Sequence, residues 1–439
     1  NGKAKKLAET KGVAKNIIFM ISDGMSIGTM SMANLYAENI LGTESNWVGL
    51  YKENKVSRAL MDTASANSII TDSAAASSAF GGGVRVNNGS LNVGPKGELH
   101  IPIWQKFKKQ GKKAGCVTTV TITHATPAGF CVNSKSRSAE AEIAEMYGEF
   151  GFDVMMGGGD EFFNAALRKD KKDLYGIYRD KGYQVLKSKA DLKTIQKGKP
   201  LLGIFNNGAL PYSLDQQHTI SLQPTPTLAD MTRAAIEQMK DHPEGFVLQV
   251  EAGKVDWAAH ANDIGALIHD QLAFDEAIKV VMDFAENDRE TMVIITTDHG
   301  NANPGTISGS DATEKFNSIA EYTFTNEYLL NEIHADFSVP QVKEWVSDVN
   351  KISLSDQEAS QLLSFYTGLQ KEEGLYNYKK LPFKLYSEMQ GKRNHVGWIS
   401  MKHSGDYVEL AMFGPGSNKL KPFMKNFELH QMMLEAALA

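Results

Sequence analysis

The strongest chemical signal in the chain lies in the segment FVLQVEAGKVDWAAHAND, which starts at Phe246. Its apolar run is predicted to be a buried strand that Glu251 closes, and Asp256 and His260 follow four residues apart. In a helix, that spacing places the carboxylate and the imidazole on one face, as a shared metal ion requires. Such a pair is commonly a solvated helix face, but this one directly follows a strand that ends in another carboxylate. We therefore predict a metal site here.

Three further segments place metal-binding side chains beside predicted strands. Asp298 and His299 are adjacent at the end of TMVIITT, and His403 precedes a late strand, with His395 as its one rival. Asp23 follows NIIFMIS, where an Asp is more commonly a helix cap. The remaining histidines are interpreted as structural or surface residues.

The segment IITDSAAASSAF places Ser73 at the start of a predicted helix of small residues. Free N–H groups and the helix dipole stabilise an anion at this position. Ser73 is therefore a candidate nucleophile, provided that a bound metal favours its deprotonated oxygen. The alternative is a capped, closely packed Ala-rich helix.

The segment TITHATPAGFCVNSKSR offers His124 and Thr126 after another predicted strand, and Pro127 suits the first turn of a helix. If that helix continued from Thr126, Arg137 would lie about three turns away. A guanidinium group suits two oxygens of a phosphate, although a single Arg without partners is usually a surface residue.

Together these donors exceed what one zinc ion can coordinate, so the sequence predicts more than one metal. Mixed imidazole and carboxylate groups favour zinc, whereas an oxygen-rich subset of Asp23, Thr126 and Glu251 suits magnesium. The complete predicted donor set is Asp23, Ser73, His124, Thr126, Glu251, Asp256, His260, Asp298, His299 and His403.

Short β-branched runs that alternate with amphipathic helical patterns must position these residues. The alternation predicts an α/β fold with a large, mostly parallel central sheet and helices on both faces. In such folds the functional crevice lies beyond the carboxyl ends of the strands. Strands are predicted over Asn16–Ile21, Ala114–Val120, Phe246–Val250, Thr291–Thr297 and Tyr407–Phe413, and helices over Ile103–Gln110, Leu228–Met239, Ile264–Ala285, Pro340–Val349 and Leu354–Leu369.

We expect a single domain over residues 1–439, with insertions at about 157–226 and 303–394. The net charge of -6 argues against a nucleic-acid partner. No apolar run approaches the roughly 18 residues that a membrane span needs. Cys116 and Cys131 are expected to be packed free thiols, with a single bridge as the alternative. The chain as given begins at Asn1 and shows no leader, and we expect a periplasmic or secreted protein.

The order of these motifs resembles the alkaline phosphatase family, and the match extends from Asn16 to Gly416. The motifs that carry the resemblance are SDG at Ser22, TDSAA at Thr71, HATPAG at His124, EAGKVD at Glu251, TTDHG at Thr296 and HSG at His403.

The resemblance implies two zinc sites and a third metal, normally magnesium. The first zinc would be held by Asp256, His260 and His403, and the second by Asp23, Asp298 and His299 beside Ser73. Asp23 would bridge to the third site, formed with Thr126 and Glu251. Arg137 would clamp the nonbridging phosphate oxygens.

Two positions vary within the family, and here they are His124 and Trp257. Imidazole is a softer ligand than carboxylate, so His124 leaves open whether the third site takes magnesium or zinc. Trp257 lacks the charge that a Lys would offer, and this His and Trp pairing resembles certain marine and cold-active bacterial enzymes.

The resemblance implies hydrolysis of phosphate monoesters through a phosphoserine, with an alkaline pH optimum. Relatives are commonly homodimers, so we expect a homodimer that acts on small-molecule phosphate monoesters. One alternative is a sulfatase or phosphodiesterase of a related fold, although Ser73 lacks the x-Pro-x-Arg sequence that follows the nucleophile in such sulfatases. The other alternative is a non-catalytic zinc- or phosphate-binding protein.

Overall fold

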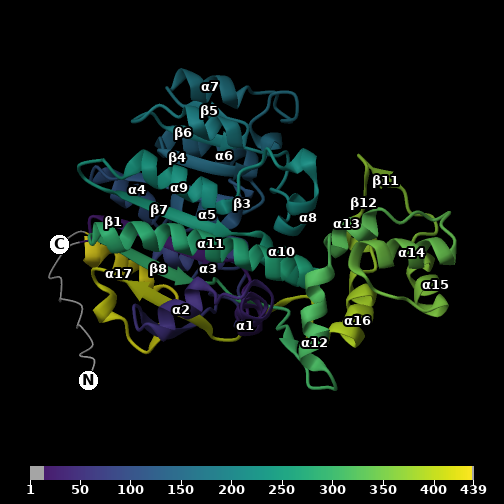
Figure 1. Cartoon of the computed structure of the whole chain (residues 1–439). Helices are drawn as coiled ribbons and strands as arrows, with labels where there is room; N and C mark the ends of the chain where they lie inside the picture. Colours follow the sequence, from purple (N-terminus) through teal and green to yellow (C-terminus); the bar gives the residue numbers. More distant parts are fainter. Residues whose placement is uncertain (1–13, 438–439) are drawn as a thin grey trace, which may run out of the picture.

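The computed structural model describes residues 14–437, and its centre is a ten-stranded sheet with the order β16-β2-β15-β8-β1-β7-β3-β4-β6-β5 (Figure 1). Strand β15 is antiparallel to both of its neighbours, β8 and β2, and all other neighbouring pairs are parallel. The prediction of a large, mostly parallel sheet is therefore confirmed. The strands are β1 (Asn16–Ser22), β2 (Ser57–Asp62), β3 (Lys113–Thr121), β4 (Val154–Gly158), β5 (Gln184–Leu186), β6 (Leu201–Ile204), β7 (Phe246–Ala252), β8 (Thr291–Thr296), β15 (Val408–Phe413) and β16 (Phe423–Lys425).

The five predicted strands correspond to β1, β3, β7, β8 and β15, with ends that agree to within two residues. Four of them, β8, β1, β7 and β3, are consecutive neighbours in the central part of the sheet, where both faces are buried. The other five strands of the central sheet were not predicted. They are short, or, like β2 with its sequence SRALMD, carry charged and exposed residues that hide the apolar signal.

Side chains of β1 alternate between two apolar cores, because successive residues of a strand point to opposite faces. Ile18 and Met20 belong to one core, and Ile17, Phe19 and Ile21 belong to the other. The first core is covered by α1 (Ile27–Tyr36), α2 (Asn46–Lys52), α8 (Ser213–His218), α9 (Leu228–Met239) and α11 (Ile264–Asp288). The second is covered by α3 (Ser73–Gly82), α4 (Ile103–Lys109), α5 (Ala125–Cys131), α6 (Glu140–Phe150), α7 (Leu174–Asp180) and α17 (Glu428–Ala437).

Figure 1 shows the helices of the segment 303–394 gathered at one end of the molecule, beside the sheet. The pattern over Leu354–Leu369 forms a shorter helix than predicted. It starts at Asp356, because Ser355 caps it in a capping box, and it ends at Ser364, before Gly368 with its φ of +74°. The elements here are β10 (Gly305–Thr306), α12 (Ala312–Asn317), α13 (Asn326–Asn331), α14 (Val339–Asn350), α15 (Asp356–Ser364), β11 (Lys371–Glu372), β12 (Leu375–Tyr376), α16 (Phe383–Asn394) and β13 (Val396–Gly397).

The segment 157–226 contributes β5 and β6 to one end of the central sheet. We propose that this segment and the segment 303–394 are insertions into one domain. A single apolar core supports this proposal, since it runs from Ile18 of the sheet to Leu362 and Tyr386 of the second segment. None of the described helices has the length and apolar character that crossing a membrane requires.

Asp270 of α11 is hydrogen-bonded to the start of α8. Its titration should make the free energy of unfolding depend on pH. Its side chain is buried and accepts a hydrogen bond from the Ser213 backbone N–H at 3.1 Å. Burial raises the pKa of Asp270 to about 7, against the lowering effect of the charge on Lys254. Because this pKa is raised above the ordinary value, the stability that the protonated carboxyl contributes is lost as pH rises from about 4 through 7.

Asp270→Asn keeps an oxygen for Ser213 and removes this titration. The stability of the variant relative to the native chain should therefore increase by about 1 kcal/mol between pH 6 and pH 9. Urea unfolding of the metal-free proteins at both pH values measures this change. The control is Asp283→Asn, which alters an exposed carboxylate of the same helix. An equal pH response in the two variants would exclude Asp270 as its source.

Candidate metal centre

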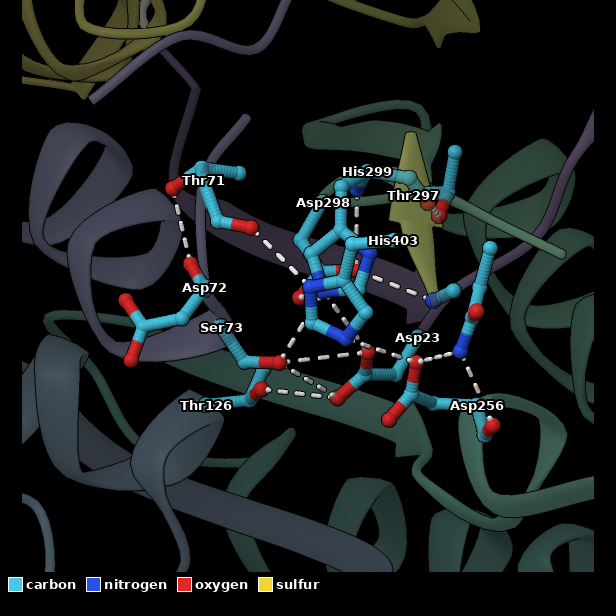
Figure 2. A network of polar contacts seen from close by, with 12 residues as sticks. Asp23, Thr71, Asp72, Ser73, Thr126, Asp256, Thr297, Asp298, His299 and His403 are labelled. Atoms are coloured by element: carbon cyan, nitrogen blue, oxygen red, sulfur yellow. Dashed lines mark hydrogen bonds and ion pairs between the residues drawn. The ribbon is translucent and has the colours of Figure 1, made fainter. Parts of the chain in front are cut away.

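Predicted metal-binding residues lie together at the carboxyl ends of β1, β7 and β8, which are neighbours in the sheet. Figure 2 shows seven of them, namely Asp23, Ser73, Thr126, Asp256, Asp298, His299 and His403. Asp23 follows β1, Glu251 lies at the end of β7, and Asp298 follows β8. Among the described residues, three groups have ligand atoms that all lie within 4.8 Å of one another: Asp256, His260 and His403; Asp23, Asp298 and His299; and Asp23, His124 and Glu251.

The first group combines a helix with a distant short strand. Helix α10 (Lys254–His260) carries Asp256 and His260 at the predicted spacing of four, and His403 begins β14 (His403–Ser404). Strand β14 pairs with β9 (Gly300–Asn301), which follows directly after His299. The two short strands therefore place His403 beside the second group, and the rings of His299 and His403 stack at a centroid distance of 3.7 Å.

The hydrogen bonds of the first group leave a gap that a cation fits. The Nδ1 atoms of His260 and His403 lie 2.8 Å from Met401 O and 2.9 Å from Thr71 O. A carbonyl oxygen only accepts, so each Nδ1 carries a hydrogen, and each Nε2 is the nitrogen that would bind a metal once it is deprotonated. Without a metal, and against the lowering effect of burial, Asp256 raises the pKa of both rings, that of His403 to about 9, and a cation would displace these protons. These Nε2 atoms lie 3.1 Å apart, and each is 3.4 Å from an oxygen of Asp256. Such an arrangement, with carbonyl oxygens that fix both rings, is typical of a metal site.

The second group surrounds the hydroxyl of Ser73, the first residue of α3. Asp72 caps this helix by accepting a hydrogen bond from the Ala75 backbone N–H at 2.9 Å, so Ser73 lies at the positive end of the helix dipole, as predicted. Ser73 Oγ lies 3.1 Å from His299 Nε2 and 3.3 Å from both carboxylate oxygens of Asp23. The backbone N–H groups of Gly24 and His299 donate to Asp298 Oδ1, whereas the buried Asp298 Oδ2 has no hydrogen-bond partner.

The third group shares Asp23 with the second and adds Glu251 and His124. Thr118 donates to Glu251 Oε2 at 2.6 Å, and Glu251 Oε1 has no hydrogen-bond partner. Thr126 Oγ1 donates to the shared carboxylate of Asp23 at 3.4 Å. His124 Nδ1 is also buried without a partner. Because buried polar atoms normally have partners, the unsatisfied Glu251 Oε1 fits a bound cation. In the neutral ring of His124, Nε2 accepts from Arg137 and Nδ1 carries the hydrogen, so a cation at Nδ1 would require that hydrogen to leave Nδ1.

The pKa shifts of the buried carboxylates and of His124 also fit bound cations. Burial and the carboxylates of Asp298, Asp256 and Glu251 raise the pKa of Asp23 well above its ordinary value. Burial raises the pKa of Glu251 to about 7. Burial and the charge of Arg137 lower the pKa of His124 to about 3, which keeps its imidazole neutral, as metal binding requires. Bound cations would offset the cost of holding these carboxylates ionised.

The route by which Arg137 reaches the site differs from the prediction. Helix α5 ends at Cys131, and Arg137 lies in the irregular chain that follows. The helix ends early because Val132 adopts an extended conformation with a φ of -138°. Arg137 nevertheless lies at the site, donating to Asp72 Oδ2 at 3.0 Å and to His124 Nε2 at 3.2 Å.

The structure also separates predicted alternatives. His395 is half-buried, contacts the carbonyl oxygen of Ile307 and belongs to none of the three groups, whereas His403 belongs to the first group. Trp257 is half-buried, and its ring lies 6.3 Å from that of His124 at an angle of 70°. Cys116 and Cys131 are buried free thiols, as expected, with 3.7 Å between their sulfur atoms.

Two residues that support the centre were not predicted. Asn301 donates to Asp256 Oδ1 at 2.7 Å, and Thr118 donates to Glu251. Thr118 lies opposite Glu251 in the parallel pairing of β3 with β7. Nothing in the spacing along the chain indicates either contact, since both depend on the order of the strands.

The family model described as alkaline phosphatase matches residues 14–439. Among curated proteins, the chain is 29% identical to alkaline phosphatase 4 of Bacillus subtilis over 432 residues, covering 97% of this chain and 89% of the relative. It is 30% identical to the alkaline phosphatase of Escherichia coli over 333 residues, covering 66% and 70% respectively.

Solved structures give the same result. The chain is similar to the alkaline phosphatase of Thermus thermophilus, with a TM-score of 0.89, 32% identity and coverage of 97% of this chain and 92% of the other. The cold-active alkaline phosphatase of a Shewanella species shares the fold, with a TM-score of 0.83, 23% identity and coverage of 97% and 100%.

Proposed function

The chain belongs to the alkaline phosphatase family and hydrolyses phosphate monoesters, and we propose that Ser73 is its nucleophile. The observation that supports this proposal is the position of Ser73 Oγ. It lies at the N-terminus of α3, within 3.3 Å of Asp23 and His299 of the second ligand group.

In the proposed reaction, Ser73 Oγ attacks phosphorus in line with the ester oxygen. The bond from Oγ to phosphorus forms as the bond to the leaving oxygen breaks, which gives the alcohol and a phosphoserine. Water then attacks the same phosphorus and releases Ser73 and inorganic phosphate, so the two displacements give net retention. Arg137, which is held beside Ser73 by Asp72, binds two nonbridging oxygens and offsets their charge in both steps.

We propose zinc for the first two groups and magnesium for the third. Metal ions there would supply Lewis acidity toward the serine oxygen, the leaving oxygen and the attacking water. Two imidazoles and a carboxylate suit zinc at Asp256, His260 and His403. His299 with two carboxylates suits it at the second group. The third group keeps the carboxylates of Asp23 and Glu251 and the hydroxyl of Thr126, with His124 as the softer ligand.

The direct test is an assay of p-nitrophenyl phosphate across pH, with metal analysis of the purified protein. We expect turnover that is highest at alkaline pH, about three metal equivalents per chain, and loss of activity after chelation that added zinc and magnesium restore. Full activity without bound metal would contradict the proposal.

Light scattering tests the homodimer that we also propose, and fractionation of the source cells tests a periplasmic or secreted location.

Trp257→Lys should tighten inhibition by inorganic phosphate. We propose that Trp257 borders the phosphate site, where an added ammonium group would attract the dianion. The inhibition constant should fall about threefold to tenfold, and kcat should fall because phosphate leaves more slowly. Steady-state inhibition measures both values. The control is Trp257→Leu, which removes the indole without adding charge and should not tighten inhibition. Equal inhibition of the native chain and Trp257→Lys would contradict this role of Trp257.

A further inference from the structure

Lys254 is a buried cation that the reaction described above does not use. Lys254 is only 6% exposed. In the sequence it lies between Glu251 and Asp256, two of the predicted metal ligands. Its ammonium group donates one hydrogen bond, to the carbonyl oxygen of Leu210 at 3.1 Å, and forms no ion pair with the described carboxylates. Burial raises the pKa values of the Asp215 and Asp270 carboxyls, and Lys254 lies near enough for its charge to lower them, but neither carboxyl is within ion-pair distance. The buried ammonium group therefore needs a closer source of stabilisation.

Two aromatic rings provide that stabilisation. Lys254 Nζ lies 3.6 Å from the ring centre of Tyr212 and 5.3 Å from that of Trp257. Both distances are within the range of a cation–π contact, and burial strengthens such contacts because water does not screen them. Lys254 and Trp257 are three residues apart in α10, which brings their side chains to the same side of the helix. The ammonium group of Lys254 therefore contacts the rings of both Tyr212 and Trp257.

The segment that contributes Tyr212 is fixed to the sheet. The Leu210 backbone N–H donates to Thr119 O of β3 at 2.8 Å. Thr119 Oγ1 in turn accepts from the backbone N–H of Gly253 at 3.0 Å, directly before α10. Tyr212 itself is 3% exposed. The ring that faces the ammonium group thus belongs to a segment that is hydrogen-bonded to the sheet, whereas Trp257 is half-buried, and its ring lies at 70° to that of His124 of the third ligand group.

We propose that Lys254 and Tyr212 are positioning residues that hold the indole of Trp257 against His124 and thereby set how tightly the site binds phosphate. The proposal rests on the proposed function, because Trp257 must border the phosphate site. Neither residue touches the substrate. Release of the indole widens the site, so binding of substrate and of phosphate weakens while the reacting groups around Ser73 stay in place.

Lys254→Met tests the ammonium group, because Met has a similar length and no charge. The Michaelis constant for p-nitrophenyl phosphate and the inhibition constant of phosphate should both rise about threefold to tenfold. The kcat value should stay within about twofold. Lys254→Arg keeps a cation over the rings and should restore both constants. A purely structural role would instead lower the melting temperature and the active fraction, and therefore kcat, and leave the Michaelis constant unchanged.

Two variants of Tyr212 test the same positioning role, and they remain available if Lys254→Met does not fold. Tyr212→Phe keeps the ring and should behave as the native chain, whereas Tyr212→Leu removes it and should weaken phosphate binding as Lys254→Met does. Equal constants in Tyr212→Phe and Tyr212→Leu would overturn the proposal.

A double-mutant cycle separates positioning from a long-range effect of charge. In the Trp257→Leu background, Lys254→Met should not change the two constants further, because no indole remains to be positioned. A full additional effect in that background would overturn the proposal. Turnover by the native chain serves as the reference throughout. If the native chain lacks turnover, the proposed function fails, whereas normal turnover with unchanged constants in all variants refutes only the positioning role.

Discussion

Ser73→Ala is expected to lower kcat for p-nitrophenyl phosphate by about 10⁴-fold or more, with no change in metal content. The oxygen that attacks phosphorus is removed, and nothing else at the N-terminus of α3 can replace it. The ligand groups keep their histidines and carboxylates, so the metals remain bound. Steady-state kinetics and metal analysis of the same preparation measure the two quantities.

The matched control is Ser78→Ala, on the same helix. Ser78 is buried and donates to the carbonyl oxygens of Ala74 and Ser90, but it belongs to none of the three ligand groups. Its replacement should lower stability slightly and leave kcat within about threefold. Acid quenching during turnover should trap phosphate on the native chain and none on Ser73→Ala. Full activity of Ser73→Ala would refute the nucleophile assignment.

His403→Ala should lower kcat/KM by about 10³-fold and remove one metal equivalent. Without this imidazole, Asp256 and His260 remain as only two protein ligands of the first group. They cannot hold zinc in the geometry that stabilises the leaving oxygen. Zinc added at high concentration should restore part of the activity, because the other two ligands are intact.

His395→Ala is the control for this change, because His395 is the rival histidine of the same segment of sequence. It belongs to none of the three groups, so its removal should leave metal content and kcat/KM within about twofold. A large loss in His395→Ala, with normal metal content in His403→Ala, would show that the first group is wrongly assigned.

The sequence allowed the central part of the fold to be predicted because its strands carry continuous apolar runs. In β1, β7 and β8 both faces are buried, so every residue contributes to the signal. In β2, the exposed Arg58 and Leu60 alternate with buried residues, and the strand was not predicted. Edge strands such as β5 and β16 are too short to give any pattern.

Local spacing also predicted which side chains share a helix face or follow a strand. Asp256 and His260 are four residues apart in one helix, and Asp72 and Ser73 open another, so these contacts depend on short-range geometry alone. The same reasoning placed Arg137 on a helix that ends six residues before it. Arg137 reaches His124 because the chain turns back, and helical periodicity contains no information about where a helix stops.

The sequence by itself therefore determined the chemical types of the ligands, their attachment to strand ends and helix starts, and the family to which their order belongs. Tertiary structure alone decided that Thr118 and Asn301 support the carboxylates, and that Lys254 contacts two aromatic rings. These contacts join residues far apart in the chain, such as Thr118 and Glu251. They depend on which strands become neighbours, and burial of the whole apolar core selects that order, which no local pattern encodes.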